Sequence, residues 1–233
     1  MSKSIIFYTD SMIGEPIKSA VEKYILEAGL PVVSCSLRPL NFGKNIVYEG
    51  SPCFITYMNQ IKIALENSEA DYVFFCEHDI LYPKCHFDFT PPKDDIYYYN
   101  TNVWRWYFGS GFAVTYDHLV SLSGLCCNRK MALEQYKGRI AKALTMPPEN
   151  NIREPSWARK WGYEPGTKRP GNGGFSEIAY EIWRSEVPIV DIRHYGTISK
   201  AKTSLEDFKH LPENWQQIRM EDIPGWNLKE VFP

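Results

Sequence analysis

The sequence lacks any apolar run long enough to cross a membrane. Of its 233 residues, 44% are hydrophobic and 23% are charged, which is ordinary for a soluble globular protein. No uninterrupted apolar stretch approaches the ~20 residues that a membrane helix needs. The opening residues, Met-Ser-Lys-Ser, lead straight into a strand pattern and do not resemble a signal peptide. These features predict a single cytoplasmic domain with a sizeable core.

The chain also has no Cys-x-x-Cys pair, so its six cysteines are expected to be reduced thiols. One zinc arrangement has to be weighed, because Cys76 and His78 are followed by Cys85 and His86. Cys76 and His78 would share a face of a strand. However, this ligand spacing is atypical for structural zinc sites.

The formal net charge is only −2, but it is unevenly placed. Residues 127–170 hold ten Lys or Arg and four Glu, a net charge of +6, which leaves −8 for the rest of the chain. Such an asymmetry favours contact with an anionic partner. A solvated basic face is the simpler alternative.

The central pattern is the apolar and aromatic run from Asp71 to Cys76, which suits a strand buried on both faces. Glu77, His78 and Asp79 end it abruptly. Because side chains alternate along an extended backbone, Glu77 and Asp79 should point one way and His78 the other. Two carboxylates at the carboxyl end of a buried strand predict a Mg²⁺ or Mn²⁺ site. The alternative is a solvated acidic turn.

Elements before this strand alternate between strand and helix patterns, which predicts parallel pairing with right-handed crossovers. We expect strands over Ser4–Tyr8 and Val32–Ser36, and helices from Pro16 to Gly29 and from Ser51 to Asn67. A loop with two basic residues spans Leu37–Ile46, and it does not have the spacing of a P-loop. Positions at the strand ends make four residues candidate nucleoside contacts: Thr9, Asp10, Arg38 and Gln60.

After the acidic turn the patterns are more mixed. The expected strands are Ile96–Asn100, Phe112–Tyr116 and Val187–Ile192, and the expected helices are His118–Leu125, Lys130–Leu144 and Phe175–Ser185. Residues 146–173 read as a long irregular loop that contains half of the basic residues of the 127–170 region. Loops of that length inside a compact domain are usually functional. The remaining tail, Thr203 to Pro233, reads as a packed extension.

Four features, taken in order, resemble the GT-A glycosyltransferases, which use nucleotide-sugar donors: a nucleoside-binding N-terminal half, Glu77-His78-Asp79, an acid at a helix start and a late His. Glu77-His78-Asp79 resembles the Asp-x-Asp motif of that family, with Glu in place of the first Asp. The turn Gly109-Ser110-Gly111 resembles a small-residue turn on the acceptor side. Glu177 stands at an expected helix start, in Gly-Phe-Ser-Glu rather than the more usual Glu-Asp pair, and His194 follows a late strand.

The resemblance implies an α/β fold with a GT-A-like, Rossmann-type mixed sheet flanked by helices, in one domain over residues 1–233. It divides the chain into a nucleotide-sugar-binding half (1–100), an acceptor and catalytic half (101–200) and a C-terminal extension (201–233). Mn²⁺ or Mg²⁺ would be held by Glu77, Asp79 and His194, and through it the diphosphate of a UDP-sugar. Glu177 would be the general base of an inverting transfer.

For the acceptor, basic residues interleaved with aromatic rings favour a nucleic acid. Phage-type enzymes that glycosylate hydroxymethylated pyrimidines in DNA would fit, which would place the protein in a bacterial or phage-infected host cytoplasm. The candidate acceptor-binding residues are Trp104, Trp106, Gly111, Arg159, Lys160, Lys168 and Arg169. Three alternatives stay open: a bacterial surface saccharide or its lipid-linked precursor as acceptor, nucleotidyl transfer, and a nucleotide-binding module without catalysis.

Overall fold

The computed structural model describes residues 1–117, 119–145, 179–197, 202 and 204–232. Its helices are α1 (Ile17–Leu26), α2 (Phe54–Glu66), α3 (Arg129–Ala143) and α4 (Leu228–Val231). Its strands are β1 (Lys3–Thr9), β2 (Val32–Ser36), β3 (Lys44–Val47), β4 (Tyr72–Glu77), β5 (Ile80–Leu81), β6 (Tyr97–Asn100), β7 (Val103–Tyr107), β8 (Phe112–Thr115), β9 (Leu125–Asn128), β10 (Tyr180–Trp183), β11 (Ile189–Arg193) and β12 (Gln216–Arg219).

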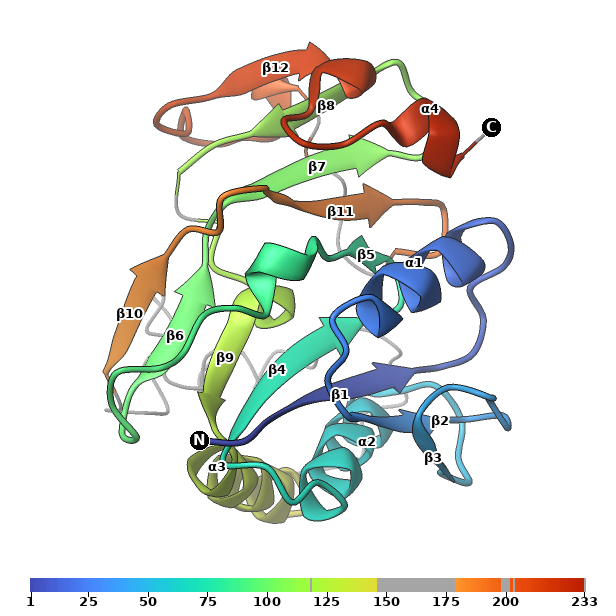
Figure 1. Cartoon of the computed structure of the whole chain (residues 1–233), viewed down its shortest axis with the longest axis vertical. Coiled ribbons are helices and arrows are strands. Elements are labelled where there is room, and N and C mark those ends of the chain that lie inside the picture. Colours follow the sequence, from blue (N-terminus) through green and yellow to red (C-terminus); the bar gives the residue numbers. More distant parts are fainter. Residues whose placement is uncertain (118, 146–178, 198–201, 203, 233) are drawn as a thin grey trace.

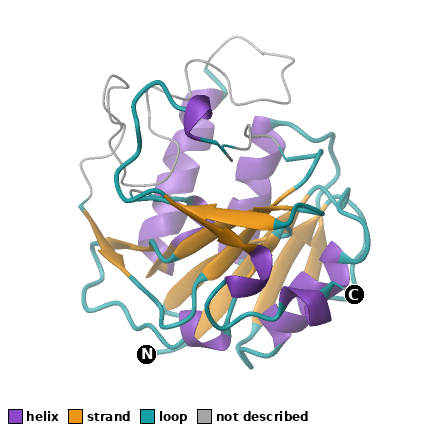
Figure 2. Cartoon of the chain, turned by 90° about the horizontal axis from the view of Figure 1, so that it is seen from above, coloured by secondary structure: helices purple, strands orange, loops and turns teal. Residues whose placement is uncertain are grey.

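A seven-stranded sheet in the order β10-β6-β9-β4-β1-β2-β3 forms the larger layer (Figure 1). β4, β1, β2 and β3 run parallel, whereas β9 lies antiparallel to both β4 and β6. β1 is buried on both faces because its alternate side chains enter different cores. Ile5 and Phe7 pack with α1, while Ile6 and Tyr8 pack with α2 and α3. Helices therefore cover both sides of the strands (Figure 2).

The chain reverses its direction across this sheet beside β1. It runs outward from β1 to β2 and β3, and then returns through α2 to β4, on the other side of β1. In open α/β sheets, the crevice at the carboxyl ends of the strands flanking such a reversal is where ligands bind. Here that position is between the ends of β1 and β4, at Thr9 and Glu77.

A second, five-stranded sheet in the order β12-β8-β7-β11-β5 lies beside the first (Figure 1). β11 runs parallel to β7 and antiparallel to the short β5, which follows β4 directly. The Ile192 amide donates to the Asp79 carbonyl over 2.9 Å. This pairing carries the end of β11, and with it His194, to the end of β4.

The described part of the C-terminal segment packs onto this second sheet. β12 pairs with β8, and the buried Trp226 donates its indole Nε1–H to the Pro188 carbonyl. None of the described helices is long and apolar enough to cross a membrane.

The α/β class and the mixed, helix-flanked sheet are confirmed, but two expected helices are wrong. Residues 122–124 form a short 3-10 turn that leads into β9, not a helix over His118–Leu125. Within Phe175–Ser185, residues Tyr180–Trp183 form strand β10, paired in parallel with β6. Pairing with a neighbouring aromatic strand overrides a helix-like pattern in a segment this short. The part before residue 179 lies outside the described residues. β3 was expected to be loop, and its pairing with β2 makes it an edge strand.

Candidate metal and nucleotide site

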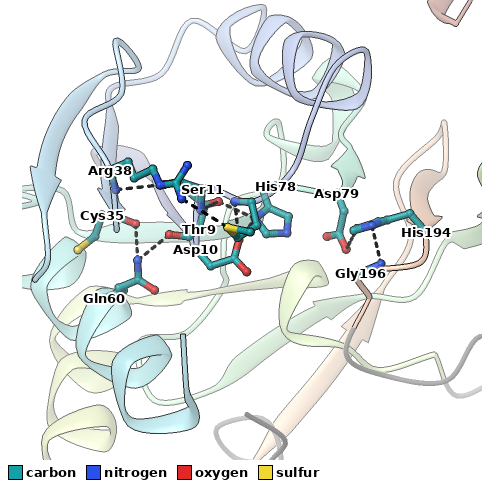
Figure 3. Close-up of polar contacts among 11 residues, drawn as sticks. Thr9, Asp10, Ser11, Cys35, Arg38, Gln60, His78, Asp79, His194 and Gly196 are labelled. Atoms are coloured by element: carbon teal, nitrogen blue, oxygen red, sulfur yellow. Dashed lines mark hydrogen bonds and ion pairs between the residues drawn. The ribbon is translucent and has the colours of Figure 1, made fainter. Parts of the chain in front are cut away.

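Polar residues from three parallel strands meet at the carboxyl edge of the larger sheet (Figure 3). Thr9 is the last residue of β1 and is followed by Asp10 and Ser11, Arg38 follows β2, and His78 and Asp79 follow β4. This edge lies beside the reversal of the chain direction. The fold therefore gathers the polar strand ends at the position where α/β sheets bind ligands.

Asp79 lies between two imidazoles. Its Oδ2 is 3.6 Å from Nε2 of His194 on one side, and the His78 ring lies on the other (Figure 3). One ligand atom from each of the three residues lies within 4.8 Å of the others. The side chains are largely buried, with exposed fractions of 21% for His78 and 14% for both Asp79 and His194. Two nitrogens and a carboxylate in this arrangement fit a divalent metal ion.

The His78 ring is oriented by two residues at the carboxyl end of β1. Its Nδ1 lies 2.6 Å from Thr9 Oγ1 and 3.7 Å from Asp10 Oδ1. The carboxylate of Asp10 favours a proton on Nδ1, which leaves the Nε2 lone pair available on the side of Asp79 (Figure 3). The Thr9 hydroxyl also accepts the Ser11 amide over 2.9 Å, so the whole turn is tied to this ring.

His194 is held differently. The Gly196 amide donates to its Nδ1 over 3.2 Å, while its buried Nε2 has no hydrogen-bond partner among the described residues and faces Asp79. A ring that accepts at Nδ1 carries its proton on Nε2 when it is neutral. In this tautomer His194 donates toward Asp79. To bind an ion through Nε2, the ring would have to carry its proton on Nδ1, and the hydrogen bond from the Gly196 amide would then be lost.

Glu77 is not part of this group, contrary to the expectation from strand alternation. β4 ends at Glu77 and the chain turns at His78 and Asp79, so the alternation of an extended strand stops before Asp79. The Glu77 Oε1 instead accepts the Tyr8 hydroxyl over 3.0 Å. Burial, together with the charge of Asp79, raises the pKa of Glu77 to about 8.

A fixed positive charge lies behind the carboxylates. Arg193 donates from Nη2 to Asp191 Oδ2 over 2.5 Å, and Arg105 donates from Nε to the same oxygen over 3.1 Å. Burial alone would lower the pKa of Arg193, but Asp191, Asp79 and Glu77 together raise it. Burial likewise opposes ionisation of Asp79, and the nearby His194, His78 and Arg193 outweigh burial and hold the pKa of Asp79 below its ordinary value.

The candidate nucleoside contacts divide into two kinds. Asp10, Ser11 and Arg38 lie at the open edge, where the Asp10 Oδ1 accepts the Met12 amide over 2.9 Å and the Arg38 amide donates to Ser11 Oγ over 3.3 Å. Gln60, by contrast, is only 3% exposed.

The Gln60 side chain is occupied by the backbone of the sheet. Its Nε2 donates to the carbonyls of Thr9 over 2.7 Å and of Cys35 over 3.2 Å. Gln60 thus joins the ends of β1 and β2 (Figure 3), and the expectation of a direct nucleoside contact through this amide is corrected.

Two candidate acceptor residues are in the core instead. Trp104 and Trp106 are 6% and 2% exposed, because both lie on β7 with their rings in the larger hydrophobic cluster. Gly111 is exposed at the start of β8. Arg159, Lys160, Lys168, Arg169 and the candidate base Glu177 lie outside the described residues.

Half of the ten basic residues of the 127–170 region are described. Arg129 donates to the carbonyls of Ala70 and Leu65, Lys137 pairs with Glu134, and Arg139 is 1% exposed. The side chains of Arg129 and Arg139 are thus engaged inside the fold, whereas Lys137 is exposed and pairs with Glu134 on the surface of α3. The described part of the region does not add to the argument for an anionic partner.

The zinc arrangement of Cys76, His78, Cys85 and His86 does not assemble. Within the described ranges, the one group of potential ligands is His78, Asp79 and His194. His86 is fully buried and stacks on Trp183 with ring centroids 5.4 Å apart.

From the sequence, His78 was not identified as a partner of Asp79 in a metal site. Its position directly after a buried strand, where the chain can turn, was the available signal.

Comparisons with known proteins give fold-level similarities of low strength. No family model matches the chain, and no curated protein sequence matches it significantly. A glycosyltransferase involved in glycosylating the major capsid of PBCV-1 aligns with a TM-score of 0.46 and 10% identity, over 82% of this chain and 93% of that one.

Two bacterial structures align less well. The Streptococcus pneumoniae TIGR4 glycosyltransferase GlyE gives a TM-score of 0.39 with 11% identity, and Staphylococcus aureus TarS 1–349 in complex with UDP-GlcNAc gives 0.38 with 12%. The alignments cover 66% and 89% of this chain, but only 41% of GlyE and 63% of TarS 1–349. Similarity at this level does not establish a common function, so the function has to be argued from the site.

Proposed function

We propose that the protein is a metal-dependent glycosyltransferase that moves a sugar from a UDP-sugar to an acceptor hydroxyl. The observation that carries this proposal is the position of Asp79, between two imidazoles at the sheet edge where the polar ends of β1, β2 and β4 converge. This edge of an α/β sheet suits a nucleotide, and a divalent ion held beside it suits a diphosphate.

In this proposal Asp79, His78 and His194 hold Mn²⁺ or Mg²⁺. The ion supplies Lewis-acid stabilisation of the negative charge that develops on the departing nucleotide. Thr9 and Asp10 orient His78, and Arg193 offsets part of the carboxylate charge. Asp10, Ser11 and Arg38 are the groups left at the open edge to contact the nucleoside.

The general base is proposed from the sequence alone. Glu177 would take the proton of the acceptor hydroxyl for an inverting, in-line attack at the anomeric carbon. Glu177→Gln should therefore keep donor affinity and lose about 10²–10⁴-fold in turnover, measured as UDP release at saturating donor. Turnover like that of the unchanged protein would remove Glu177 from this role, and Glu181→Gln is the matched control, since Glu181 lies on β10 and pairs with Lys93.

For the acceptor we propose hydroxymethylated pyrimidines in DNA, supported by the net charge of +6 over residues 127–170. Arg159, Lys160, Lys168 and Arg169 would bind the DNA. Substituting these four by Ala should weaken DNA binding and flatten its salt dependence while UDP affinity is unchanged. If gel shifts show no salt-sensitive binding, a surface saccharide replaces DNA as the acceptor.

The test of the activity is to incubate the protein with UDP-sugars, Mn²⁺ and DNA containing hydroxymethylcytosine or hydroxymethyluracil, and to analyse the nucleosides by mass spectrometry. Glycosyl transfer adds a hexose or pentose mass to the base and releases UDP. Nucleotidyl transfer would release diphosphate or a sugar phosphate, and a binding module would release nothing. Unmodified DNA should bind without forming product, because it lacks the nucleophilic hydroxyl.

A further inference from the structure

His78 occupies the middle of Glu77-His78-Asp79, and its surroundings make it the best prepared nitrogen ligand of the site. A metal-binding imidazole works best when its other nitrogen is fixed by a hydrogen bond, because that bond sets the tautomer and the ring orientation. His78 meets this condition through Thr9 Oγ1, which lies 2.6 Å from Nδ1, and the Asp10 carboxylate adds a negative charge 3.7 Å from the same nitrogen.

The other two candidate ligands are less well prepared. Glu77 is turned away, with its carboxyl bonded to the Tyr8 hydroxyl. His194 accepts the Gly196 amide at Nδ1, which places its own proton on Nε2, the atom that faces Asp79. Binding an ion through that atom would cost the Gly196 hydrogen bond.

We propose that His78 and Asp79 are the principal ligands, that His194 is the weaker third, and that this mixed set selects nitrogen-preferring ions over Mg²⁺. The inference rests on the proposed function for its setting, and it specifies which ion the site takes. Imidazole ligands suit Zn²⁺ and the later transition ions, whereas Mg²⁺ prefers an all-oxygen shell. The expected order of affinity is Mg²⁺ below Mn²⁺, and Mn²⁺ below Co²⁺.

The test uses the full-length protein stripped with a chelator, without any nucleotide. Co²⁺ is titrated by visible absorption, because its d–d bands report nitrogen ligation, and Mn²⁺ and Mg²⁺ are titrated by calorimetry. We expect Co²⁺ to bind at least about tenfold more tightly than Mg²⁺. His78→Ala should lose more than about 100-fold in Co²⁺ affinity and change the spectrum, and His194→Ala should lose less.

Three further variants separate ligation from folding. Thr9→Val removes the hydrogen-bond partner of His78 Nδ1, together with the acceptor of the Ser11 amide, and should cost about 10–100-fold in Co²⁺ affinity. His78→Asp replaces nitrogen by oxygen and should narrow the gap between Co²⁺ and Mg²⁺. His210→Ala, at an exposed histidine, is the matched control and should change nothing. Circular dichroism confirms that each variant is folded.

Two results would overturn the inference: Mg²⁺ binding as tightly as Co²⁺, or a folded His78→Ala variant with unchanged Co²⁺ affinity and spectrum. Neither depends on turnover. If the ion order and the variants behave as expected while no UDP-sugar is consumed, the proposed function fails and the inference stands. If sugar is transferred while His78→Ala leaves metal binding unchanged, only the inference fails.

Discussion

Oδ2 of Asp79 lies 3.6 Å from Nε2 of His194, although the two residues follow different strands of different parts of the chain. The contact is fixed by the backbone, because the Asp79 carbonyl accepts the Ile192 amide at 2.9 Å where β11 meets β5. The second sheet therefore completes the site that the first sheet begins. Substitutions that weaken the packing of β11 should therefore disturb the arrangement of Asp79 and His194, although they replace neither residue.

Asp191 on β11 provides the sharpest such change. It is buried and binds both Arg105 and Arg193, so Asp191→Ala leaves two positive charges without their shared partner. Removing one partner of a buried ion pair typically costs about 3–5 kcal/mol, and we expect a loss of that order in the free energy of unfolding, measured with urea. Arg219→Ala breaks exposed pairs with Asp222 and Glu221 and should change stability little. Equal effects of the two substitutions would contradict the buried network.

His86 makes the stability of the fold depend on pH. Burial lowers the pKa of His86 to about 3 from its ordinary 6.5, and the Asn100 amide lies 3.0 Å from its Nδ1. The folded protein keeps this ring neutral, whereas the unfolded chain binds a proton below its ordinary pKa. The contribution of His86 to the free energy of unfolding should thus fall by about 1.4 kcal/mol for each pH unit below about 6.5, whereas Glu77, whose pKa is raised to about 8, contributes in the opposite direction over the same range.

Urea unfolding at several pH values between about 7.5 and 5 measures this dependence. His86→Gln keeps an uncharged group that can accept from Asn100, and its free energy of unfolding should rise relative to that of the unchanged protein as the pH falls below about 6.5. The same slope in both proteins would assign the acid sensitivity to other groups.

The parallel half of the fold could be predicted from the sequence because its signals are local. Buried apolar strands such as Ser4–Tyr8 and Asp71–Cys76, with amphipathic segments between them, specify the crossovers directly. β10 could not be predicted in this way, since Tyr180–Trp183 becomes a strand only by pairing with β6. The burial of Trp104 and Trp106 could not be predicted for a similar reason. Their rings on β7 become part of the core only when the second sheet is assembled.

Asp79 and His194 were predicted together at the site, and the structure places them together. The position of Glu77 was predicted from strand alternation, which assumes that the strand continues to Asp79. The chain turns at His78 instead, so the alternation of side chains ends there. His78, and not Glu77, therefore lies with Asp79. Gln60 shows a different limit of prediction from the sequence. Its position in a helix pattern does not indicate that its side chain donates to two carbonyls at the ends of neighbouring strands.

Gln60→Met tests whether the Gln60 amide holds the ends of β1 and β2 together. Met has a similar volume but no donor, so the carbonyls of Thr9 and Cys35 would lose their shared amide in a buried position. Leaving buried polar groups unpaired costs about 1–3 kcal/mol, and urea unfolding should show a loss in that range. Asn59→Ala is the control on the same helix, because Asn59 bonds only the Ile55 carbonyl within the helix. If Gln60→Met is as stable as the unchanged protein, the two strand ends do not need this bond.

Asp79→Asn gives the most direct test of how the site meets a diphosphate, because its effect on UDP binding should change sign with the ion. The substitution removes one negative charge while nearly keeping the shape of the side chain. With Mn²⁺ present, UDP affinity measured by calorimetry should fall, since the carboxylate ligand is lost. With a chelator present, the charge of Asp79 only repels the diphosphate, so the variant should bind UDP more tightly than the unchanged protein. Asp222→Asn, at an exposed carboxylate paired with Arg219, should change neither value. A site that binds UDP without an ion would show the same change under both conditions, and that result would remove Asp79 from the proposed metal centre.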